Sequence, residues 1–196
     1  MPEAAQRPLM RAQAMTLRFG GVTALSEVSI DVGRDEVRAI IGPNGAGKSC
    51  TLNCLNGFNV PQEGKLFFED TDITGRAPHE IAKLGVGRTF QGLQLFPGLS
   101  VLDNLLTGRH LHMRAGALKG FLYWPWTHRE ELEHRRKVEE IVDFLEIKNI
   151  RHRMVGSLSY GLRKRVDLGR ALAMEPRVLL MDEPMAGMNL EEKEDM

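Results

Sequence analysis

The chain of 196 residues has few cysteines, no long apolar run and no net charge. Its two cysteines, Cys50 and Cys54, lie four positions apart in an expected helix, which excludes a disulfide framework and indicates a reducing compartment. No run approaches about 18 apolar residues, and residues 1–15 lack the apolar core of a signal peptide, so the sequence predicts no membrane-spanning helix. Lys and Arg number 26, as do Asp and Glu, which excludes a general field that attracts DNA or an anionic membrane.

The order of the expected elements indicates an α/β protein. Hydrophobic residues at 42% and charged residues at 27% are ordinary values for a globular chain. Strands are expected at residues 28–32, 37–41, 66–68 and 178–181, and a helix at 161–174. Because a mainly helical stretch at 92–155 interrupts this pattern, the sequence predicts a mostly parallel α/β core with an inserted helical subdomain.

Two apolar patterns carry this interpretation. Residues 37–41 are expected to form a strand in which Ala39, Ile40 and Ile41 are buried. A second pattern has the spacing i, i+3, i+4, i+7 of a helix with one buried face, and it consists of Val138, Ile141, Val142 and Leu145.

A phosphate-binding loop follows the expected strand at 37–41. Residues 42–49 match the pattern GxxxxGK[ST] between a strand and a helix, the context that this motif requires. Glycines let backbone N–H groups converge on phosphate oxygens, and the N-terminus of the following helix adds positive potential. Lys48 offers a charge to the β- and γ-phosphates of ATP, and Ser49 offers a hydroxyl to Mg²⁺. The predicted nucleotide contacts are Gly42, Pro43, Asn44, Gly45, Ala46, Gly47, Lys48, Ser49 and Cys50.

Two acidic residues end the apolar run at 178–181. A buried strand that delivers a carboxylate at its C-terminal end is how this fold class holds Mg²⁺ near a phosphate. Asp182 is therefore the predicted metal ligand, and Glu183 is the predicted general base for the attacking water. The alternative is a core strand that ends in a solvated acidic turn.

Three further motifs occur in a fixed order around these two. Gln91 ends the sequence GRTFQ, LSYGL occupies residues 158–162, and AGMN occupies residues 186–189. In this order the chain resembles an ATP-binding cassette (ABC) ATPase. The resemblance implies a P-loop NTPase (RecA-like) core at 1–91 and 157–196, with an N-terminal antiparallel β subdomain and an inserted helical subdomain at 92–156.

The resemblance also implies roles for individual residues. Phe19 is similar to the aromatic residue that stacks on adenine, and Gln91 to the Q-loop residue that contacts Mg²⁺, assists catalysis and couples to a membrane partner. Ser159 and Gly161 are similar to the signature residues that contact the γ-phosphate of ATP bound to the other subunit. The implied metal ligands are Ser49, Gln91 and Asp182.

The subtype follows from the residues after Gln91. LFP at 95–97, VLDNL at 101–105 and Tyr160 are similar to the ATPases of branched-chain amino-acid importers, while importers of urea or short amides use similar cassettes. The implied partners are transmembrane permease subunits, a second identical or different ATPase subunit and, indirectly, a solute-binding protein, with no nucleic acid. The implied location is peripheral, at the cytoplasmic face of the inner membrane.

The sequence departs from the family pattern at three points. Leu162 replaces a glutamine of the signature, and Cys50 replaces a threonine. All six histidines precede Glu183, whereas the switch histidine of the family follows it, so the chain is expected to be a C-terminally truncated cassette that lacks the last strands. Three functions stay open: an importer ATPase, a nucleotide-binding but hydrolysis-deficient fragment, and a soluble non-transport ABC ATPase.

Other conspicuous residues are expected to be structural. His110 and His112 are interpreted as packing or surface residues, and Cys54 as a small buried apolar residue. The aromatic residues at 121–126 are either packed or part of a docking surface for a membrane subunit. Residues 163–165 are either a solvated helix face or a source of positive potential near the phosphates.

Overall fold

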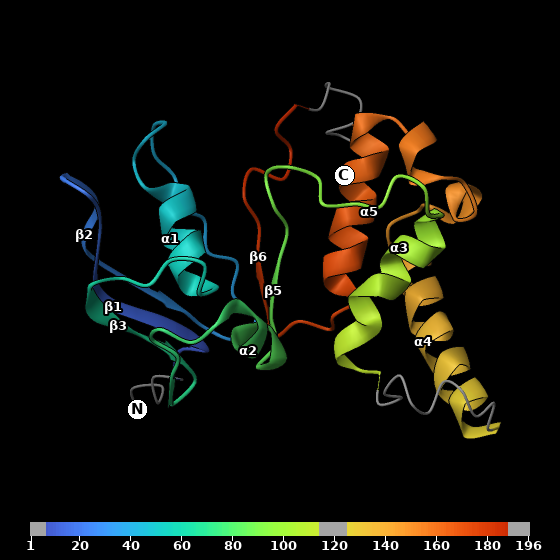
Figure 1. The fold of residues 1–196 in the computed structure, drawn as a ribbon, viewed down its shortest axis with the longest axis horizontal. Coiled ribbons are helices and arrows are strands. Elements are labelled where there is room, and N and C mark those ends of the chain that lie inside the picture. The colour runs from blue at the N-terminus through green and yellow to red at the C-terminus, as the bar shows by residue number, and fades with distance from the viewer. Residues whose placement is uncertain (1–6, 114–124, 188–196) are drawn as a thin grey trace, which may run out of the picture. The chain divides into compact units, whose positions relative to one another are not determined.

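The computed structural model describes residues 7–113 and 125–187, with side chains in the second range described from residue 130. The chain forms two compact units that divide between Val86 and Gly87 (Figure 1). The boundaries expected from the sequence, an ATP-binding core at 1–91 and 157–196 and a helical subdomain at 92–156, stay a prediction.

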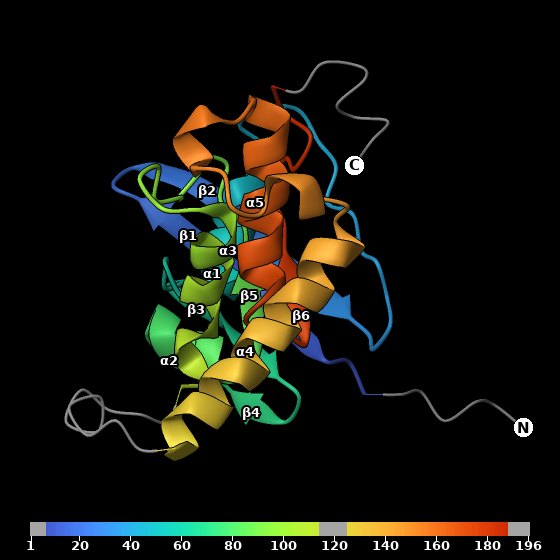
Figure 2. The same ribbon diagram turned by 90° about the vertical axis from the view of Figure 1, so that its right-hand side faces the viewer.

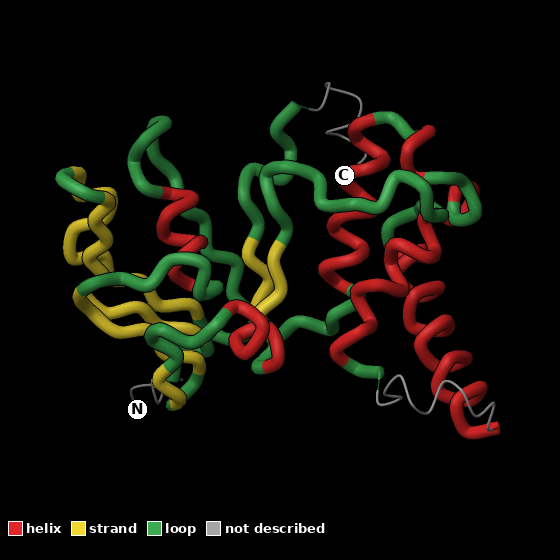
Figure 3. The backbone as a smooth tube through the Cα atoms, in the orientation of Figure 1, coloured by secondary structure: helices red, strands yellow, loops and turns green. Residues whose placement is uncertain are grey.

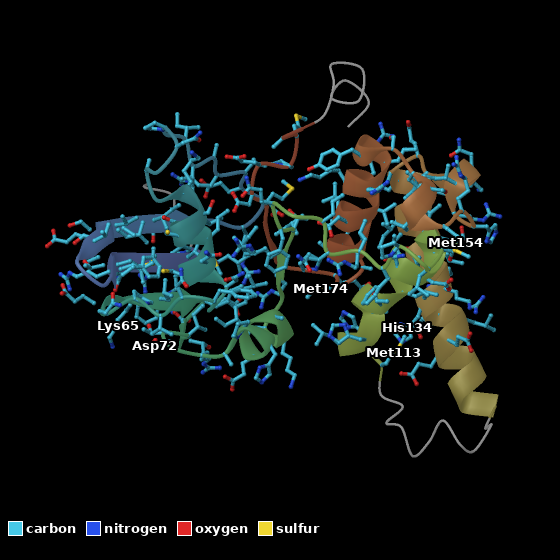
Figure 4. All side chains as sticks on the ribbon, turned by 45° about the horizontal axis from the view of Figure 1, so that its top comes forward. Lys65, Asp72, Met113, His134, Met154 and Met174 are labelled. Carbon is cyan, nitrogen blue, oxygen red and sulfur yellow. The ribbon has the colours of Figure 1, made fainter. Side chains whose placement is uncertain are left out.

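The first unit contains a four-stranded antiparallel sheet. Its strands have the order β2-β1-β3-β4. They are β1 (Met10–Phe19), β2 (Val22–Val32), β3 (Glu63–Phe68) and β4 (Thr71–Asp72). Met10 pairs with Val32 on one side and with Phe68 on the other, which fixes the register of the central strand. At the β3–β4 edge Lys65 Nζ lies 3.4 Å from Asp72 Oδ2 (Figure 4). The strands expected at 28–32 and 66–68 are confirmed within longer strands.

The described residues of this unit also form two short helices. α1 (Lys48–Leu55) buries Leu52, Cys54 and Leu55. α2 (Pro78–Lys83) begins at a proline, whose fixed φ and missing N–H suit the first turn of a helix.

The strand expected at 37–41 is wrong. This segment belongs to the loop between β2 and α1, drawn in green in Figure 3. Val37 is 97% exposed and Ile41 is 91% exposed, and Ala39 is also exposed. An apolar run of this kind is stable as a strand only when neighbouring strands pair with it and cover it. None of the described strands pairs with residues 37–41, so the periodicity of the sequence alone does not fix their conformation.

The second unit combines a pair of strands with helices. β5 (Val86–Arg88), at the division between the units, and β6 (Val178–Leu180) form a two-stranded sheet and run in the same direction (Figure 1). The N–H of Thr89 donates to the carbonyl of Leu180 at 3.0 Å, which extends the pairing beyond β5. The strand expected at 178–181 is therefore confirmed, one residue shorter.

The described residues of this unit also form α-helices and short 3-10 helices (Figures 1 and 2). They are α3 (Val101–Thr107), η1 (Gly108–Leu111), α4 (Pro125–Phe144), η2 (Lys148–Ile150), η3 (Val155–Ser157) and α5 (Tyr160–Leu172). α3 packs against both α4 and α5. The predicted apolar stripe is confirmed, because Val138 and Val142 are fully buried in the core while Ile141 and Leu145 pack at its edge.

A buried arginine ties this unit together. Arg109 Nε donates to Nδ1 of His134, a residue of α4 labelled in Figure 4, at 3.2 Å. Arg109 Nη1 donates to the carbonyl of Ala173 at 2.9 Å and lies 3.1 Å from Glu175 Oε2. One guanidinium thus links η1, α4 and the end of α5. Of the described residues, none belongs to a helix long and apolar enough to cross a membrane.

Candidate functional site

The phosphate loop passes from an exposed segment into the first turn of α1. Gly45 and Gly47 have φ values of 83° and 90°, a region that favours glycine. A Cβ on Gly47 would lie 2.8 Å from the carbonyl oxygen of Ala24 and 2.7 Å from Leu25 Cδ2. The loop therefore presses against β2 at a point where only a residue without a side chain fits.

The side chain of Lys48 lies along this loop. Its Nζ donates to the carbonyl of Gly42 at 2.9 Å and to that of Pro43 at 3.0 Å. Gly47, the N-cap of α1, has no side chain that can accept a hydrogen bond from the first turn. The loop thus combines a lysine charge, a glycine backbone and an uncapped helix N-terminus, an arrangement that fits phosphate groups.

The neighbouring predicted residues are also accessible. Ser49 is exposed and Cys50 is half-buried at the start of α1, whereas Cys54 is fully buried. Burial raises the pKa of the Cys54 thiol to about 11, with a smaller contribution from Cys50. Phe19, at the end of β1, is an exposed aromatic residue, as stacking on a base requires. The expectation that Cys54 is a buried apolar residue is confirmed.

In the second unit, the two acidic residues follow β6 but differ in their surroundings. The side chain of Asp182 is 7% exposed, and its Oδ2 lies 3.6 Å from Nη2 of Arg88, which is 8% exposed. Burial lowers the pKa of Arg88, and the charge of Asp182 opposes this effect. Glu183 is exposed, has a φ of 47°, and its carbonyl accepts a hydrogen bond from the N–H of Ala186. The alternative interpretation, a strand that ends in a solvated acidic turn, therefore fits Glu183 but not the buried Asp182.

Gln91 lies shortly after the C-terminal end of β5, just as Asp182 and Glu183 lie shortly after the C-terminal end of β6. Because the two strands run in the same direction, their carboxyl ends lie at the same edge, where ligands of α/β proteins bind. The Gln91 side chain is exposed, while its carbonyl accepts a hydrogen bond from Lys164 Nζ of α5 at 3.4 Å. The structure thus brings Gln91, Asp182 and Glu183 to one edge of a sheet.

The signature residues form the start of α5. Ser159 is the N-cap, and its Oγ accepts a hydrogen bond from the N–H of Leu162. Gly161 lies in the first turn, and the side chain of Leu162 packs against the helical core, which explains an apolar residue at this position. A Cβ on Gly187 would lie 3.1 Å from the Tyr160 ring, so the turn after Glu183 packs against the signature. Residues 188 and 189 of the AGMN motif lie outside the described residues.

The predicted site residues therefore fall on both units. The first unit holds Phe19, the loop at 42–49 and Cys50, and the second holds the others. These others are Gln91, Ser159, Gly161, Asp182 and Glu183. The side chains of the aromatic patch at 121–126 lie outside the described residues, so both interpretations of that patch stay predictions.

The sequence analysis does not predict the burial of four polar residues that support the site. Their common signal is a polar side chain at an apolar position of a strand or helix. They are Arg88, Asn104, Lys164 and Asp167. The solvated helix face proposed for residues 163–165 is wrong for Lys164, which is buried. His110 and His112 each bond a backbone carbonyl, which fits their interpretation as structural residues.

The fold and these motifs define a P-loop ATPase cassette, and comparison with known proteins identifies its family. The family model described as ABC transporter matches residues 25–186. The chain belongs to the ABC transporter ATPase family.

Its relatives include ATP-binding proteins of one transport subtype. The chain is 36% identical to the high-affinity branched-chain amino acid transport ATP-binding protein BraF of Pseudomonas aeruginosa, over 97% of this chain and 74% of the relative. It is 40% identical to a probable branched-chain amino acid transport ATP-binding protein LivG of Methanocaldococcus jannaschii, over 91% and 69%. A solved structure of the ADP conformation of an ATP-binding cassette is 38% identical and has a TM-score of 0.80, covering 96% of this chain and 73% of that one. The predicted fold class is confirmed.

Proposed function

We propose that this chain is the ATP-hydrolysing subunit that energises an importer of branched-chain amino acids or related small polar solutes. The observation that carries the proposal is its identity of 36–40% to proteins named for this transport, over more than nine-tenths of the chain. The geometry of the phosphate loop supports the nucleotide part of the proposal, and the chain's membership of the ABC family supports the ATPase part.

ATP binding uses mainly the first unit. The loop at 42–49 holds the phosphates through backbone N–H groups, Lys48 supplies the opposing charge, and Phe19 stacks on the adenine. Cys50 borders the phosphates from the first turn of α1.

The chemistry of three predicted ligands suits a Mg²⁺ ion that accompanies the nucleotide. Ser49, Gln91 and Asp182 supply a hydroxyl, an amide and a carboxylate oxygen, and Mg²⁺ prefers such oxygen ligands while it keeps water and phosphate in its shell. The described residues contain no cluster of three His, Cys, Asp or Glu that could form an all-protein metal cage. The ion would neutralise charge on the phosphates.

Hydrolysis requires a base for the attacking water, and we assign Glu183 to this role. A carboxylate at the exposed end of β6 can accept the proton of a water molecule, whereas an amide cannot. A second ATPase subunit completes the nucleotide site. Its signature residues, Ser159 and Gly161, face the γ-phosphate.

The proposed membrane partner is a pair of permease subunits, bound at the cytoplasmic face. The helical part of the second unit exposes Phe96, Leu99 and Met154. Leu99 and Met154 lie together, because Ser100 bridges to Met154 and the N–H of Val155 donates to the Leu99 carbonyl. Such a small apolar group suits docking to a helix of a membrane subunit.

The test is leucine uptake in an Escherichia coli strain that lacks its own branched-chain amino acid transport ATP-binding protein LivG, a relative that is 33% identical to this chain. Expression of this chain should restore uptake, and Lys48→Ala or Glu183→Gln should not. A chain that accumulates and binds ATP but leaves uptake absent would contradict the assigned solute class and partner. The comparisons lend no support to a hydrolysis-deficient fragment or to a soluble non-transport cassette.

A further inference from the structure

Two charged side chains of α5 are buried on the face that meets residues 90 and 91. Lys164 is 5% exposed and Asp167 is 2% exposed, and they lie three positions apart on one side of the helix. Lys and Asp are rarely buried unless they are paired, because removing a charge from water is unfavourable. Their position therefore calls for partners of matching polarity.

Both side chains find such partners in the backbone that follows β5. Lys164 Nζ donates to the carbonyl of Gln91 at 3.4 Å and lies 5.7 Å from the centroid of the Tyr160 ring. The carboxylate of Asp167 accepts a hydrogen bond from the N–H of Phe90 and another from Arg170 Nη2 at 2.9 Å. A cavity of about 10 Å³ remains between this part of α5 and residues 89 and 90, so the contact is close.

The hydrogen bonds made by Asp167 and Lys164 hold the backbone at the start of residue 90 and at the end of residue 91. The N–H of Phe90 precedes the rotatable backbone bonds of residue 90, and the carbonyl of Gln91 follows those of residue 91. Holding both groups therefore restricts the four φ and ψ angles that determine the direction of the Gln91 side chain. Since that side chain is exposed, its own packing contributes little to its direction.

We propose that Lys164 and Asp167, here called the α5 clamp, are positioning residues for Gln91. They act through the backbone of residues 90 and 91 and touch neither nucleotide nor metal. Because the signature residue Ser159 caps the N-terminus of α5, a shift of this helix would move Gln91 as well. The α5 clamp thereby links the signature to the Q-loop within one chain. The part that concerns Mg²⁺ rests on the function proposed above for Gln91.

The first experiment measures amide hydrogen exchange in the full chain without nucleotide. Asp167→Ala removes the acceptor of the Phe90 N–H, so that amide should exchange roughly tenfold faster or more. Asp167→Asn keeps an acceptor and should retain most of the protection. Arg136→Met, which removes a cation that is 71% exposed on α4, is the control and should leave Phe90 unchanged. Equal exchange of Phe90 in wild type and Asp167→Ala would overturn the proposal.

The second experiment is a double-mutant cycle that measures binding of a fluorescent ATP analogue with Mg²⁺ and with a chelator. With Mg²⁺ present, Lys164→Met should weaken the affinity for the analogue roughly tenfold, whereas the affinity in chelator should stay unchanged. Lys164→Arg should restore much of the affinity that depends on Mg²⁺. In a Gln91→Ala background, Lys164→Met should have no further effect. An undiminished effect in that background would show a general structural role and overturn the proposal.

The two experiments separate this proposal from the proposed function. If wild type binds no nucleotide, the proposed function fails, while the exchange of Phe90 still decides whether the α5 clamp exists. If wild type binds Mg²⁺ and nucleotide but the cycle shows no coupling between Lys164 and Gln91, only the inference about positioning fails.

Discussion

Arg88 Nη2 lies 3.6 Å from Asp182 Oδ2, and both side chains are almost completely buried. Arg88 is the last residue of β5, and Asp182 lies two residues after the end of β6. The Arg88 guanidinium also lies 5.1 Å from the centroid of the Phe90 ring. The carboxylate that is proposed to bind Mg²⁺ therefore has a cation of its own in the same chain. The charge of Arg88 compensates part of the unfavourable burial of Asp182.

Replacing Arg88 by methionine should destabilise the protein, because Asp182 loses this buried cation. A loss of roughly 3 kcal/mol in the free energy of unfolding is expected. Urea denaturation measures it, with Arg136→Met as the matched loss of an exposed cation, expected to change stability by about 0.5 kcal/mol or less. Equal stability of the two variants would contradict a stabilising role of the ion pair.

Two glycines of the phosphate loop allow a matched comparison. Gly47→Ala places a methyl group against Ala24 and Leu25, so it should both distort the loop and abolish nucleotide binding. Gly45→Ala has the same kind of positive φ but nothing within 4 Å of the new Cβ, so its expected effect is only a backbone strain of about 1 kcal/mol. Thermal unfolding and ATP titration of both variants measure the difference. If Gly47→Ala binds ATP like wild type, the described loop conformation is wrong.

Asn104 should be essential for the segment that follows the Q-loop. Its Oδ1 accepts a hydrogen bond from the N–H of Phe96, and its Nδ2 donates to the carbonyls of Phe96 and Ser100. Because Asn104 is fully buried, Asn104→Ala leaves these groups unsatisfied and should lower stability by roughly 2–3 kcal/mol. Asn149→Ala, at an exposed position, is the control. A similar small effect of both changes in urea denaturation would refute this role.

The fold could be predicted from the sequence wherever the pattern is local. Residues that favour a helix end or a helix start flank α1 and α2: Gly57 follows the first helix, and Pro78 begins the second. The apolar stripe of α4 likewise follows from the spacing of Val138 and Val142. These features depend on neighbours in the sequence, and so the sequence is sufficient.

The remaining features depend on contacts between distant parts of the chain. The segment 37–41 has the composition of a buried strand, but a strand of this kind requires a paired neighbour, which its own sequence does not specify. The sequence places Lys164 either on a solvated helix face or near the phosphates, since a lysine is usually exposed. Its hydrogen bond joins residues 73 positions apart, which no local period reveals.

The raised pKa of Cys54 leads us to expect a specific dependence of stability on pH. Its pKa is raised from 9.0 to about 11, mainly by burial, so the folded state keeps the proton where the unfolded state releases it. This contribution is fully present below pH 9 and is lost as the pH rises from 9 to 11. The free energy of unfolding of wild type should therefore fall more steeply over this interval than that of Cys54→Ala. Parallel curves for the two proteins would contradict the raised pKa.

The two cysteines should also differ in reactivity. Cys50 is half-buried beside the phosphate loop, whereas Cys54 is fully buried and stays a thiol at neutral pH. Iodoacetamide at pH 8 should modify Cys50 first, and bound ATP should slow this reaction. Peptide mass spectrometry identifies the site, with Cys50→Ser as the control. Modification of Cys54 first, or no protection by ATP, would contradict the position proposed for Cys50.

The loop at 42–49 is proposed to bind ATP through Lys48. Isothermal titration calorimetry of the full chain with Mg·ATP tests it most directly, using Lys48→Ala as the only change. We predict saturable binding by wild type and at least a roughly tenfold weaker affinity for Lys48→Ala, because the charge opposite the β- and γ-phosphates is lost. Equal affinity of the two proteins for Mg·ATP would contradict the account.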